Sequence, residues 1–409
     1  MKVLMIAVFP PYKAPEADHA LHLCEHLADH GVQMHVIAQK GCAIPSHPRI
    51  TVYPVMRKWS WPELTKLVRL TRRCSPDAIL LVYIGWIYND HPMVTFFPTV
   101  AKALLPRVPV VTLFEDRYGA HPEHTSIVAR AVRKVVTRWA GQHDVDYEFG
   151  TLLRDSNRLI VVSERSRAAL AERFHGVNSK SVLIPCPAIM SISSEDDGKT
   201  RRQKRASLEL KDDEFLIAYF GYIYPGKGVE TLLKAFQIVN GQRRPVRLIL
   251  IGGVLKRPSY YQKIQAMPKE LGIENKVIWT GEYTWDSEEA SRCLRAADMC
   301  VLPFDRGVCV HHSSLAGACA HGLPIITTQG IDMEPLFNHM SNVFLCPPQN
   351  PEALAQAMET LMANPDLRER LSTGAGELTQ EWFSWEKAVE RTVETLRVGG
   401  AGPSKLELT

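Results

Sequence analysis

A glycine-rich loop with a single lysine is the first stretch of this chain whose residue types could bind an anion. Residues 221–228 read GYIYPGKG, and an amphipathic helical pattern follows at residues 229–239. Glycines let backbone N–H groups approach an anion closely, and Lys227 adds a cation at the end of the helix that carries positive partial charge. The loop is therefore predicted to bind a phosphate group.

A second segment gathers hydroxyls and imidazoles at the start of another helix. His311 and His312 stand directly before Ser313 and Ser314, and small residues follow up to residue 322. Either serine can cap that helix, and small residues permit close approach of a ligand or a strand. We predict a second phosphate cradle here, and an N-cap with tight helix packing is the structural alternative.

The first loop also matches most of the phosphate-binding loop of nucleotide hydrolases. That pattern, G-x-x-x-x-G-K, ends in a Ser or Thr that holds Mg²⁺, and Gly228 stands in that position here. The strand expected at residues 248–251 ends in Gly252-Gly253, where such a hydrolase needs an aspartate. We therefore disfavour a nucleotide hydrolase, and a glycine turn beside a solvated lysine is the structural alternative.

Parallel strands must position both loops. Short Val-, Ile- and Leu-rich runs alternate with helical patterns along the whole chain. The runs are apolar on both faces, which is typical of parallel strands that helices cover on both sides. The helical pattern at residues 16–30 completes a first βαβ unit. The predicted strands are residues 3–8, 34–38, 78–84, 109–114, 159–163, 216–220, 248–251, 277–279, 299–302 and 324–328.

The alternation breaks between residues 191 and 214. Acidic residues are followed there by a basic cluster, which we interpret as a solvated hinge region. The sequence therefore predicts an α/β fold with two doubly wound parallel sheets of similar size. The default binding site of such a protein is a cleft between the domains.

Composition excludes several other classes of protein. The chain has 409 residues, of which 45% are hydrophobic and 22% charged, as in ordinary globular proteins of two or three domains. A disordered tail protein, a collagen-like chain and a small disulfide scaffold are excluded. The net charge of +4 is too small for this length to indicate a dedicated nucleic-acid binder.

Cysteine usage and apolar runs indicate the expected compartment. The nine cysteines include no C-x-x-C pair, so we expect neither a disulfide framework nor a zinc ribbon, and a reducing cytoplasm fits best. The first apolar run stops at Pro10-Pro11, too early for a signal peptide. The longest apolar stretch, residues 78–88, is shorter than the roughly 18 residues that span a bilayer. No transmembrane segment is predicted.

Ordered sequence blocks resemble the family 4 retaining glycosyltransferases, which have the GT-B fold. The second half contains FGYIYPGKGVETLLKAF, LILIGG, KVIWTGEY, AADMCVLPF, AHGLPIITT and PPQNPEALAQAMETLMANP, in the family's order and spacing. The first half contains FPPYKAPEADHALHLCEHLADHGVQMHVIA, which resembles the family's Pro-Pro loop and first helix, and RLIVVSERSRAAL, which resembles a later strand and helix. The closing FSWEKAVERTVETL is similar to the final helix, which crosses back onto the first domain.

The resemblance implies a reaction and a division of roles between two Rossmann-like domains. Residues 1–187 with 384–409 would bind the acceptor, and residues 188–383 would bind a nucleotide-sugar. The family transfers the sugar to a hydroxyl with its anomeric configuration retained, without an essential metal or a cofactor. The expected product belongs to glycan, glycolipid or glycosylated-metabolite biosynthesis, in the cytoplasm or at the cytoplasmic face of a membrane.

The resemblance also assigns donor contacts. The diphosphate would lie between the glycine loop and the start of the Ser313/Ser314 helix, where Lys227 would stabilise the departing charge. The expected donor contacts are Gly221, Tyr222, Gly226, Lys227, Gly253, Asp305, Arg306, Gly307, His311, His312, Ser313, Ser314 and Leu315.

The acceptor would lie against the first domain. We expect contacts with Lys13, Glu16 and His121, and expect Glu115 or Asp116 to orient or deprotonate the acceptor hydroxyl. A pair of acids that caps a loop is the structural alternative for these two carboxylates.

Several positions depart from the family's pattern. Tyr222 stands where the family usually has an arginine on the diphosphate, so Lys227 must carry more of the charge. Gly317 occupies the position of the second glutamate of the family's E-x7-E signature, which normally holds the ribose. Asp305 could replace the first glutamate, and Phe114 stands where the family often has a histidine.

Other classes of protein stay open as alternatives. The missing arginine, histidine and glutamates would suit a GT-B protein that binds a partner or a sugar nucleotide without turnover. A nucleotide-sugar epimerase or phosphorylase of the same fold is the third interpretation. Asp144 and Asp146 form a D-x-D pattern, but such short acidic patterns are common by chance, so we expect no metal.

Two groups of basic and aromatic residues predict peripheral contact with a membrane. Basic side chains beside aromatic ones suit an anionic bilayer surface. Packing of an amphipathic helix on the sheet explains the first group equally well. The first group is Ile127, Arg130, Ala131, Arg133, Lys134, Val135, Arg138 and Trp139, and the second is Trp59, Trp61, Lys66, Arg69, Arg72 and Arg73.

Overall fold

The computed structural model of the chain divides into two compact units. It describes residues 1–115, 149–193, 197–241, 245–253, 258–284 and 286–399, together with Val135 and Arg138. The first unit comprises Met1–Pro185 with Trp385–Thr409, and the second comprises Cys186–Ser384. These bounds lie within two residues of the domain ends expected from the sequence.

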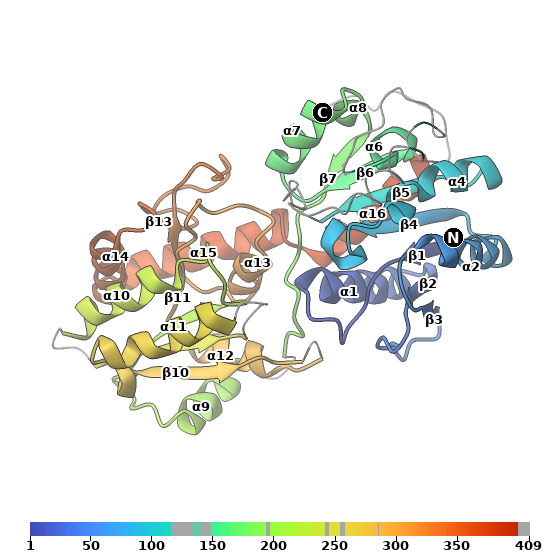
Figure 1. Ribbon diagram of the computed structural model, residues 1–409. Helices are drawn as coiled ribbons and strands as arrows, with labels where there is room; N and C mark the ends of the chain where they lie inside the picture. Colours follow the sequence, from blue (N-terminus) through green and yellow to red (C-terminus); the bar gives the residue numbers. More distant parts are fainter. Residues whose placement is uncertain are drawn as a thin grey trace. The chain divides into compact units, whose positions relative to one another are not determined.

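A seven-stranded parallel sheet forms the centre of the first unit (Figure 1). Its strands are β1 (Lys2–Ile6), β2 (Gln33–Gln39), β3 (Ile50–Met56), β4 (Ala78–Tyr83), β5 (Val110–Phe114), β6 (Arg158–Val161) and β7 (Ser181–Leu183). The order is β3-β2-β1-β4-β5-β6-β7, and β4 and β5 are buried along their whole length.

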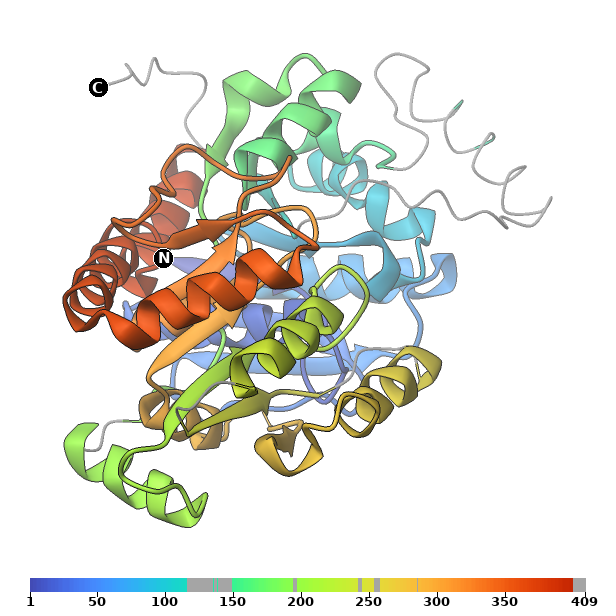
Figure 2. The same ribbon diagram turned by 90° about the vertical axis from the view of Figure 1, so that its left-hand side faces the viewer.

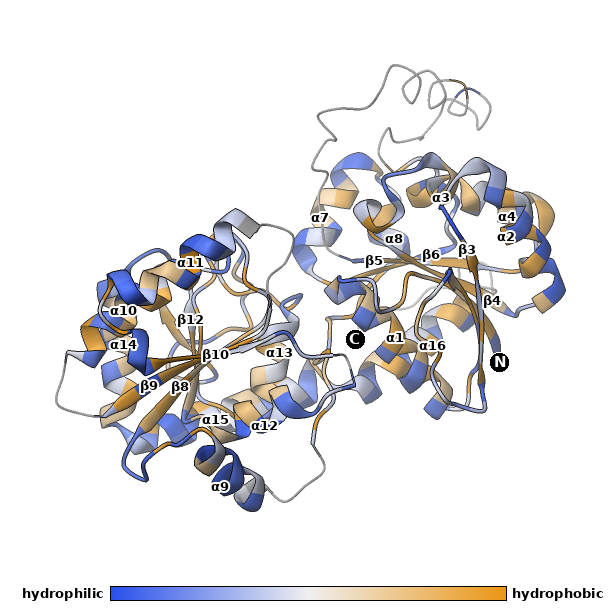
Figure 3. Cartoon of the chain, turned by 60° about the horizontal axis from the view of Figure 1, so that its bottom comes forward, coloured by the Kyte–Doolittle hydropathy of each residue, from blue (hydrophilic) through white to orange (hydrophobic). Residues whose placement is uncertain are grey.

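Helices cover both faces of this sheet. They are α1 (Pro15–Asp29), α2 (Trp61–Cys74), α3 (Pro92–Thr95), α4 (Phe97–Leu104), α6 (Leu152–Asp155), α7 (Glu164–Arg173), α8 (Val177–Lys180) and α16 (Trp385–Val398), with a 3-10 turn at Gly85–Tyr88. Figure 3 shows α1 and α16 on one face and α2, α3 and α4 on the other. Burial between two helical layers explains why these strands are apolar on both sides.

A six-stranded parallel sheet forms the centre of the second unit. Its strands are β8 (Phe215–Phe220), β9 (Val246–Ile251), β10 (Val277–Gly281), β11 (Met299–Leu302), β12 (Ile325–Thr328) and β13 (Phe344–Cys346), in the order β10-β9-β8-β11-β12-β13. Its helices are α9 (Asp197–Ser207), α10 (Val229–Asn240), α11 (Pro258–Glu270), α12 (Glu289–Ala296), α13 (Ser313–Ala320), α14 (Pro351–Ala363) and α15 (Pro365–Glu381), with a 3-10 turn at Glu274–Lys276. Figure 2 views the unit from the side of α10 and α14.

The predicted fold class is confirmed, because both sheets are parallel and doubly wound. All ten expected strands are present, but β3, β7 and β13 were missed. β3 is a half-exposed edge strand interrupted by Pro54, and the other two strands are only 3 residues long. None of the three presents the continuous apolar run by which a buried strand is recognised.

The expectation of a solvated hinge over residues 191–214 was wrong. Helix α9 forms within this segment and packs against α12 (Figure 2). Arg201 and Arg205 of α9 form ion pairs with the carboxylate of Asp298, which precedes β11. The basic cluster therefore docks a helix on the second unit, and its acidic partner lies too far along the chain for a local charge pattern to reveal.

The fold also divides the second basic and aromatic group. Trp59 is only 5% exposed and packs edge-on against Tyr88, with 4.8 Å between the ring centroids. Its assignment to a membrane-facing surface was therefore wrong, because the indole belongs to the core. The first group lies almost wholly outside the described residues. Across the described ranges, none of the helices combines the length and apolar character needed to cross a bilayer.

Loss of Asp298 should destabilise the second unit. Its carboxylate accepts the amide of Leu216 in β8 at 2.7 Å as well as the two guanidinium groups. We expect Asp298→Ala to lower the free energy of unfolding by roughly 2–4 kcal/mol, because three donors lose a charged acceptor. Thermal unfolding measures the effect, with the exposed Asp212→Ala as control. An Asp298→Ala variant that unfolds at the same temperature as the control would contradict this role.

Candidate functional site

The strand order of the second sheet places the two predicted phosphate loops at one point. β8 and β11 are neighbours, with Met299 paired to Ile217. The chain leaves β8 toward β9 but leaves β11 toward β12, in the opposite direction. In open α/β sheets such a switch point, at the carboxyl ends of the strands, is where ligands bind. The loops concerned are residues 221–228 and 303–312, so the structure brings together the segments that the sequence indicated.

Two glycines allow these loops to touch. The carbonyl of Gly226 accepts a hydrogen bond from the amide of Asp305 at 3.0 Å. Gly228 has a φ of +69°, and a Cβ atom on it would lie 1.9 Å from the carbonyl oxygen of Pro303. Residue 228 therefore has no room for a serine or threonine. This contact explains why the loop departs from the nucleotide-hydrolase pattern, which needs a hydroxyl there.

The start of α13 supplies hydrogen-bond donors. Ser314 is 5% exposed, and its Oγ has no hydrogen-bond partner in the part of the chain that the structure describes. His312 precedes the helix without capping it through its side chain, and amides of a first turn have no acceptor within the helix. A Cβ on Gly221 would lie 3.2 Å from Cβ of Ser314, so the glycine loop runs directly beside this serine. The arrangement suits an anion.

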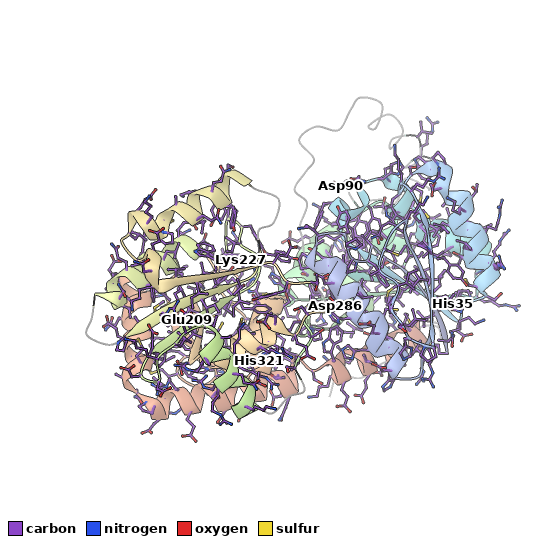
Figure 4. The ribbon with its side chains drawn as sticks, turned by 90° about the horizontal axis from the view of Figure 1, so that it is seen from below. His35, Asp90, Glu209, Lys227, Asp286 and His321 are labelled. Carbon is purple, nitrogen blue, oxygen red and sulfur yellow. The ribbon has the colours of Figure 1, made fainter. Side chains whose placement is uncertain are left out.

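Lys227 is the cation of this site (Figure 4). Its Nζ lies 5.2 Å from the centroid of the Tyr224 ring and 4.8 Å from that of Phe304. Aromatic faces attract a cation without neutralising it. Lys227 forms no ion pair with any of the described carboxylates. A positive charge without a carboxylate partner thus stands beside the first turns of α10 and α13.

His312 does not add to that charge. Its ring stacks on Phe304, with 3.8 Å between the centroids. Burial, the neighbouring His311 and the charge of Lys227 hold the pKa of His312 well below the ordinary value. Nδ1 of His311 lies 2.9 Å from Sγ of Cys309. His312 is therefore a neutral aromatic support for the loop at neutral pH.

Three expected donor contacts have structural partners within the protein. The guanidinium of Arg306 donates two hydrogen bonds to the carboxylate of Asp332, at 2.8 and 3.1 Å. Gly307 has a φ of +99°, and a Cβ on it would lie 2.5 Å from the amide nitrogen of Gly330. Leu315 is fully buried in the core. These three residues shape the second loop and the base of α13.

Gly253 and Asp305 border the glycine loop. The carbonyl of Gly253 accepts the amide of Ile223 at 2.8 Å, so the loops after β8 and β9 are joined. Burial and the charge of the nearby Glu230 raise the pKa of Asp305. The side chain of Tyr222 is half-exposed on the same loop.

The helix α13 has no room for the second glutamate of the family signature. A Cβ on Gly317 would lie 2.6 Å from Cε1 of Phe220 and 3.3 Å from Sδ of Met190. The ring of Phe220 therefore fills the space that a longer side chain at this position would need. The packing of Phe220 therefore accounts for the glycine that stands at residue 317 in place of the family's glutamate.

One buried acid was missed by the sequence analysis. Glu334 is 7% exposed, and its carboxylate accepts the amide of Val310 at 2.7 Å. Glu334 lies in the loop after β12, at the same edge of the sheet. Its position after a predicted strand was the only feature of the sequence that could have indicated it. Within the described ranges, no group of three or more His, Cys, Asp and Glu side chains is arranged to hold a metal ion.

The first sheet has its own switch point, between β1 and β4. Lys13 lies exposed in the loop after β1, and Glu16 lies in the first turn of α1. Sequence analysis missed an aromatic pair at the same place: Tyr12 follows β1 and Trp86 follows β4, with 5.9 Å between their ring centroids. Only the adjacency of the two strands, which the sequence does not state, brings these rings together.

Glu115 is held by α1. The residue is 8% exposed, its amide donates to the carbonyl of Tyr83 at 3.0 Å, and its carboxylate contacts Nδ1 of the buried His19. The carboxylate is therefore bonded to an imidazole within the first unit. Asp116 and His121, the other two residues expected near the acceptor, lie outside the described residues.

Two protein families match the two halves of the chain. Glycosyltransferase Family 4 matches residues 17–188, and Glycosyl transferases group 1 matches residues 200–377. Together they include most of both units, whose parallel sheets are those of a GT-B fold. The chain therefore belongs to the family 4 type of GT-B glycosyltransferases.

Individual relatives are distant. An uncharacterised glycosyltransferase of Methanocaldococcus jannaschii is 23% identical over 60% of this chain and 60% of its own length. A D-inositol 3-phosphate glycosyltransferase of Jonesia denitrificans is 24% identical over 61% of this chain and 57% of its own length. The chain thus spans about three fifths of these two relatives. Anabaena HepE, solved with UDP and glucose, has a TM-score of 0.70 and 17% identity, covering 97% of this chain and 100% of HepE.

Alanine at residue 317 should destabilise the protein although alanine favours helices. Gly→Ala in an open helix interior raises stability by roughly 0.5–1 kcal/mol. At Gly317 the new methyl group must displace Phe220, so we expect the free energy of unfolding to fall by about 1–3 kcal/mol. Chemical denaturation followed by circular dichroism measures the change.

The matched control for this substitution lies in α15. A Cβ on Gly376 meets nothing within 4 Å, so Gly376→Ala should be stabilising. Adding Phe220→Leu to Gly317→Ala should restore part of the lost stability. If Gly317→Ala and Gly376→Ala were equally stable, the ring of Phe220 would not fill the space above residue 317.

Proposed function

We propose that this protein transfers a sugar from a nucleotide-diphosphate sugar to a hydroxyl group, with the anomeric configuration retained. The proposal is carried by two groups at the switch point of the second sheet: among the described residues, Lys227 is a cation without a carboxylate partner, and the buried hydroxyl of Ser314 has no hydrogen-bond partner. Family membership and the UDP bound in HepE support a nucleotide-sugar as the donor.

The proposed site acts mainly by stabilising charge on the leaving group. When the glycosidic bond breaks, negative charge collects on the diphosphate, and its oxygens would accept bonds from Lys227, Ser314 and the first amides of α13. Such preorganised donors lower the barrier most because they need not reorganise during the reaction. An oxygen of the leaving phosphate can take the acceptor proton, so no nucleophile from the protein is needed.

The acceptor side of the proposal rests on the first unit. The acceptor hydroxyl, on a glycan, a lipid-linked sugar or a small molecule, would contact Lys13, Glu16 and His121, with Glu115 or Asp116 as the orienting acid. Because His19 holds Glu115, that carboxylate would act by fixing the orientation of its neighbours. We propose a cytoplasmic location, supported by nine cysteines that are all free.

A GT-B protein that binds without turnover is the second candidate. Phe220 over Gly317 favours it, because this packing removes a carboxylate position of the family's signature. Incubation with a panel of nucleotide-sugars separates the two candidates. Transfer or hydrolysis of a donor supports the enzyme, whereas donor binding without any turnover supports the second candidate.

Removal of the Lys227 charge should mainly slow the chemical step. We expect Lys227→Ala to lower kcat by on the order of 10²–10³. The binding free energy of the donor should weaken less, by roughly 1.5–3 kcal/mol, because only the bond made in the ground state is lost. Lys234→Ala, which removes an exposed lysine seven residues further along the chain, in α10, is the control. Full transfer activity in a folded Lys227→Ala variant would refute the donor site.

Ser314→Ala should have a smaller effect than Lys227→Ala. The substitution removes one neutral hydroxyl, and the backbone amides of α13 remain, so kcat should fall about tenfold or less. Steady-state kinetics on both variants gives the comparison. A larger loss in Ser314→Ala than in Lys227→Ala would place the diphosphate away from the lysine.

Chelation of metal ions should leave the reaction intact. If Lys227 and helix amides supply the positive charge, sugar transfer should continue in EDTA at the untreated rate. A nucleotide hydrolase would instead need Mg²⁺ for turnover. Loss of transfer in EDTA, restored by a divalent cation, would show that a metal replaces the proposed role of the lysine.

A further inference from the structure

Two aromatic rings meet where the strand order of the first sheet reverses. Tyr12 belongs to the loop after β1, and Trp86 belongs to the 3-10 turn that follows β4. Their ring centroids lie 5.9 Å apart, and the ring planes are inclined by 35°. Both side chains pack against the first core and are half-buried, so part of each ring reaches the surface. We call these two rings the aromatic pair.

The turn that carries Trp86 is tightly closed. The carbonyl of Gly85 accepts the amide of Asp90 at 2.9 Å, and the carbonyl of Trp86 accepts the amide of Asn89 at 3.2 Å. Asn89 and Asp90 have φ values of +53° and +51°. Left-handed residues that carry side chains are strained, and such conformations cluster at ligand sites. The turn therefore fixes Trp86 in place although its backbone is strained.

Buried aromatic side chains support this turn. Tyr88, its last residue, is fully buried, and the Tyr88 hydroxyl donates to the carbonyl of Val82 at 2.6 Å. The Tyr88 ring stacks on Tyr83 at 6.1 Å between centroids and packs edge-on against Trp59. Trp86 therefore stands on a support that packing and hydrogen bonds hold in place, as a preorganised binding surface requires.

A carboxylate lies beside each ring of the aromatic pair. A Cβ on Gly85 would lie 2.2 Å from Oδ1 of Asp90, so this carboxylate (Figure 4) lies beside the residue that precedes Trp86. Glu16 lies close to Tyr12: burial and the charge of Glu16 raise the pKa of Tyr12. The phenol therefore keeps its proton at neutral pH and can donate a hydrogen bond.

Aromatic faces next to carboxylates suit a sugar ring. One face of a pyranose presents C–H groups that pack on an aromatic surface, and its rim carries hydroxyls that donate to carboxylates. Binding sites for small molecules combine apolar area with a few placed polar groups in this way. A flat aromatic acceptor would contact the rings, but its apolar edge would lie against the two carboxylates, where a charge is costly.

We propose that the aromatic pair binds a pyranose ring, so that the acceptor hydroxyl of this protein is carried by a sugar. Trp86 would lie against the C–H face of that ring, and Asp90 and Glu16 would accept hydrogen bonds from its hydroxyls. The proposal rests on the proposed function, because it names the class of acceptor for the same reaction. It keeps a glycan and a lipid-linked sugar as acceptors and excludes a small molecule without a sugar ring.

Saturation-transfer NMR on the full chain, without a donor, tests this site. The probes are the methyl glycosides of glucose, galactose and mannose, with phenol as a ligand that offers a flat aromatic ring instead. We expect at least one glycoside to bind, with the strongest transfer to the ring protons of one face. Trp86→Ala should raise its dissociation constant on the order of tenfold, as removal of an aromatic face does for a stacked base, whereas Trp86→Phe should keep most of the affinity.

Matched variants separate the aromatic pair from folding and from the donor site. Tyr12→Ala should also weaken glycoside binding. Tyr261→Ala, which removes a half-buried tyrosine from a ring pair of the second unit, should not. Lys227→Ala should bind the glycosides like the parent, because the donor lysine takes no part in this contact. Circular dichroism checks that each variant is folded.

The outcomes also distinguish this proposal from the proposed function. The aromatic pair is overturned as a sugar site if none of the glycosides binds, if phenol binds as tightly as the best glycoside, or if folded Trp86→Ala binds normally. Sugar transfer to an acceptor without a sugar ring, at an unchanged rate in Trp86→Ala, overturns it and leaves the proposed function intact. Glycoside binding that depends on Trp86, without turnover of any nucleotide-sugar, supports the sugar site and overturns the proposed function.

Discussion

The close approach of the loops after β8 and β11 is the contact on which the rest of the second unit's site depends. It requires Gly228 in a left-handed conformation against the carbonyl of Pro303, with Gly226 bonded to the amide of Asp305. A side chain at residue 228 would separate the loops. Lys227 would then no longer stand beside Phe304, and the first turns of α10 and α13 would no longer converge.

Lys227 differs from the arginines that dock the loops and helices of the second unit. Arg201, Arg205 and Arg306 are each bonded to a carboxylate, as exposed or half-buried arginines commonly are. Lys227 instead rests on two aromatic rings, and the neighbouring His312 stays neutral because it is buried. A fixed cation with no partner among the described carboxylates suits a ligand that brings its own negative charge.

The departures from the family's pattern have packing explanations. Phe220 lies over Gly317 in place of a glutamate side chain, and Phe114 belongs to the first core, where its ring packs edge-on against Phe149 at 5.6 Å. Glu115, the residue after Phe114, is turned to His19. At residues 114 and 317 aromatic packing therefore takes the place of polar contacts, and Lys227 and the start of α13 remain as the proposed donor contacts of the second unit.

The sequence by itself determined the two doubly wound sheets and indicated the two loops that are proposed to bind phosphate. Parallel strands covered on both faces must be apolar along their length, and that pattern is local. Glycine, lysine and serine at a strand end also signal anion binding over a few residues. The sequence did not predict the edge strand β3, the helix α9 or the burial of Trp59. Half-exposed or strongly polar elements resemble loops in a local pattern, and the burial of one side chain depends on its tertiary contacts. Only the tertiary structure decided which cations are paired and which are free, and which ring fills the space at Gly317. Those contacts join residues far apart in the chain, and no local pattern records them.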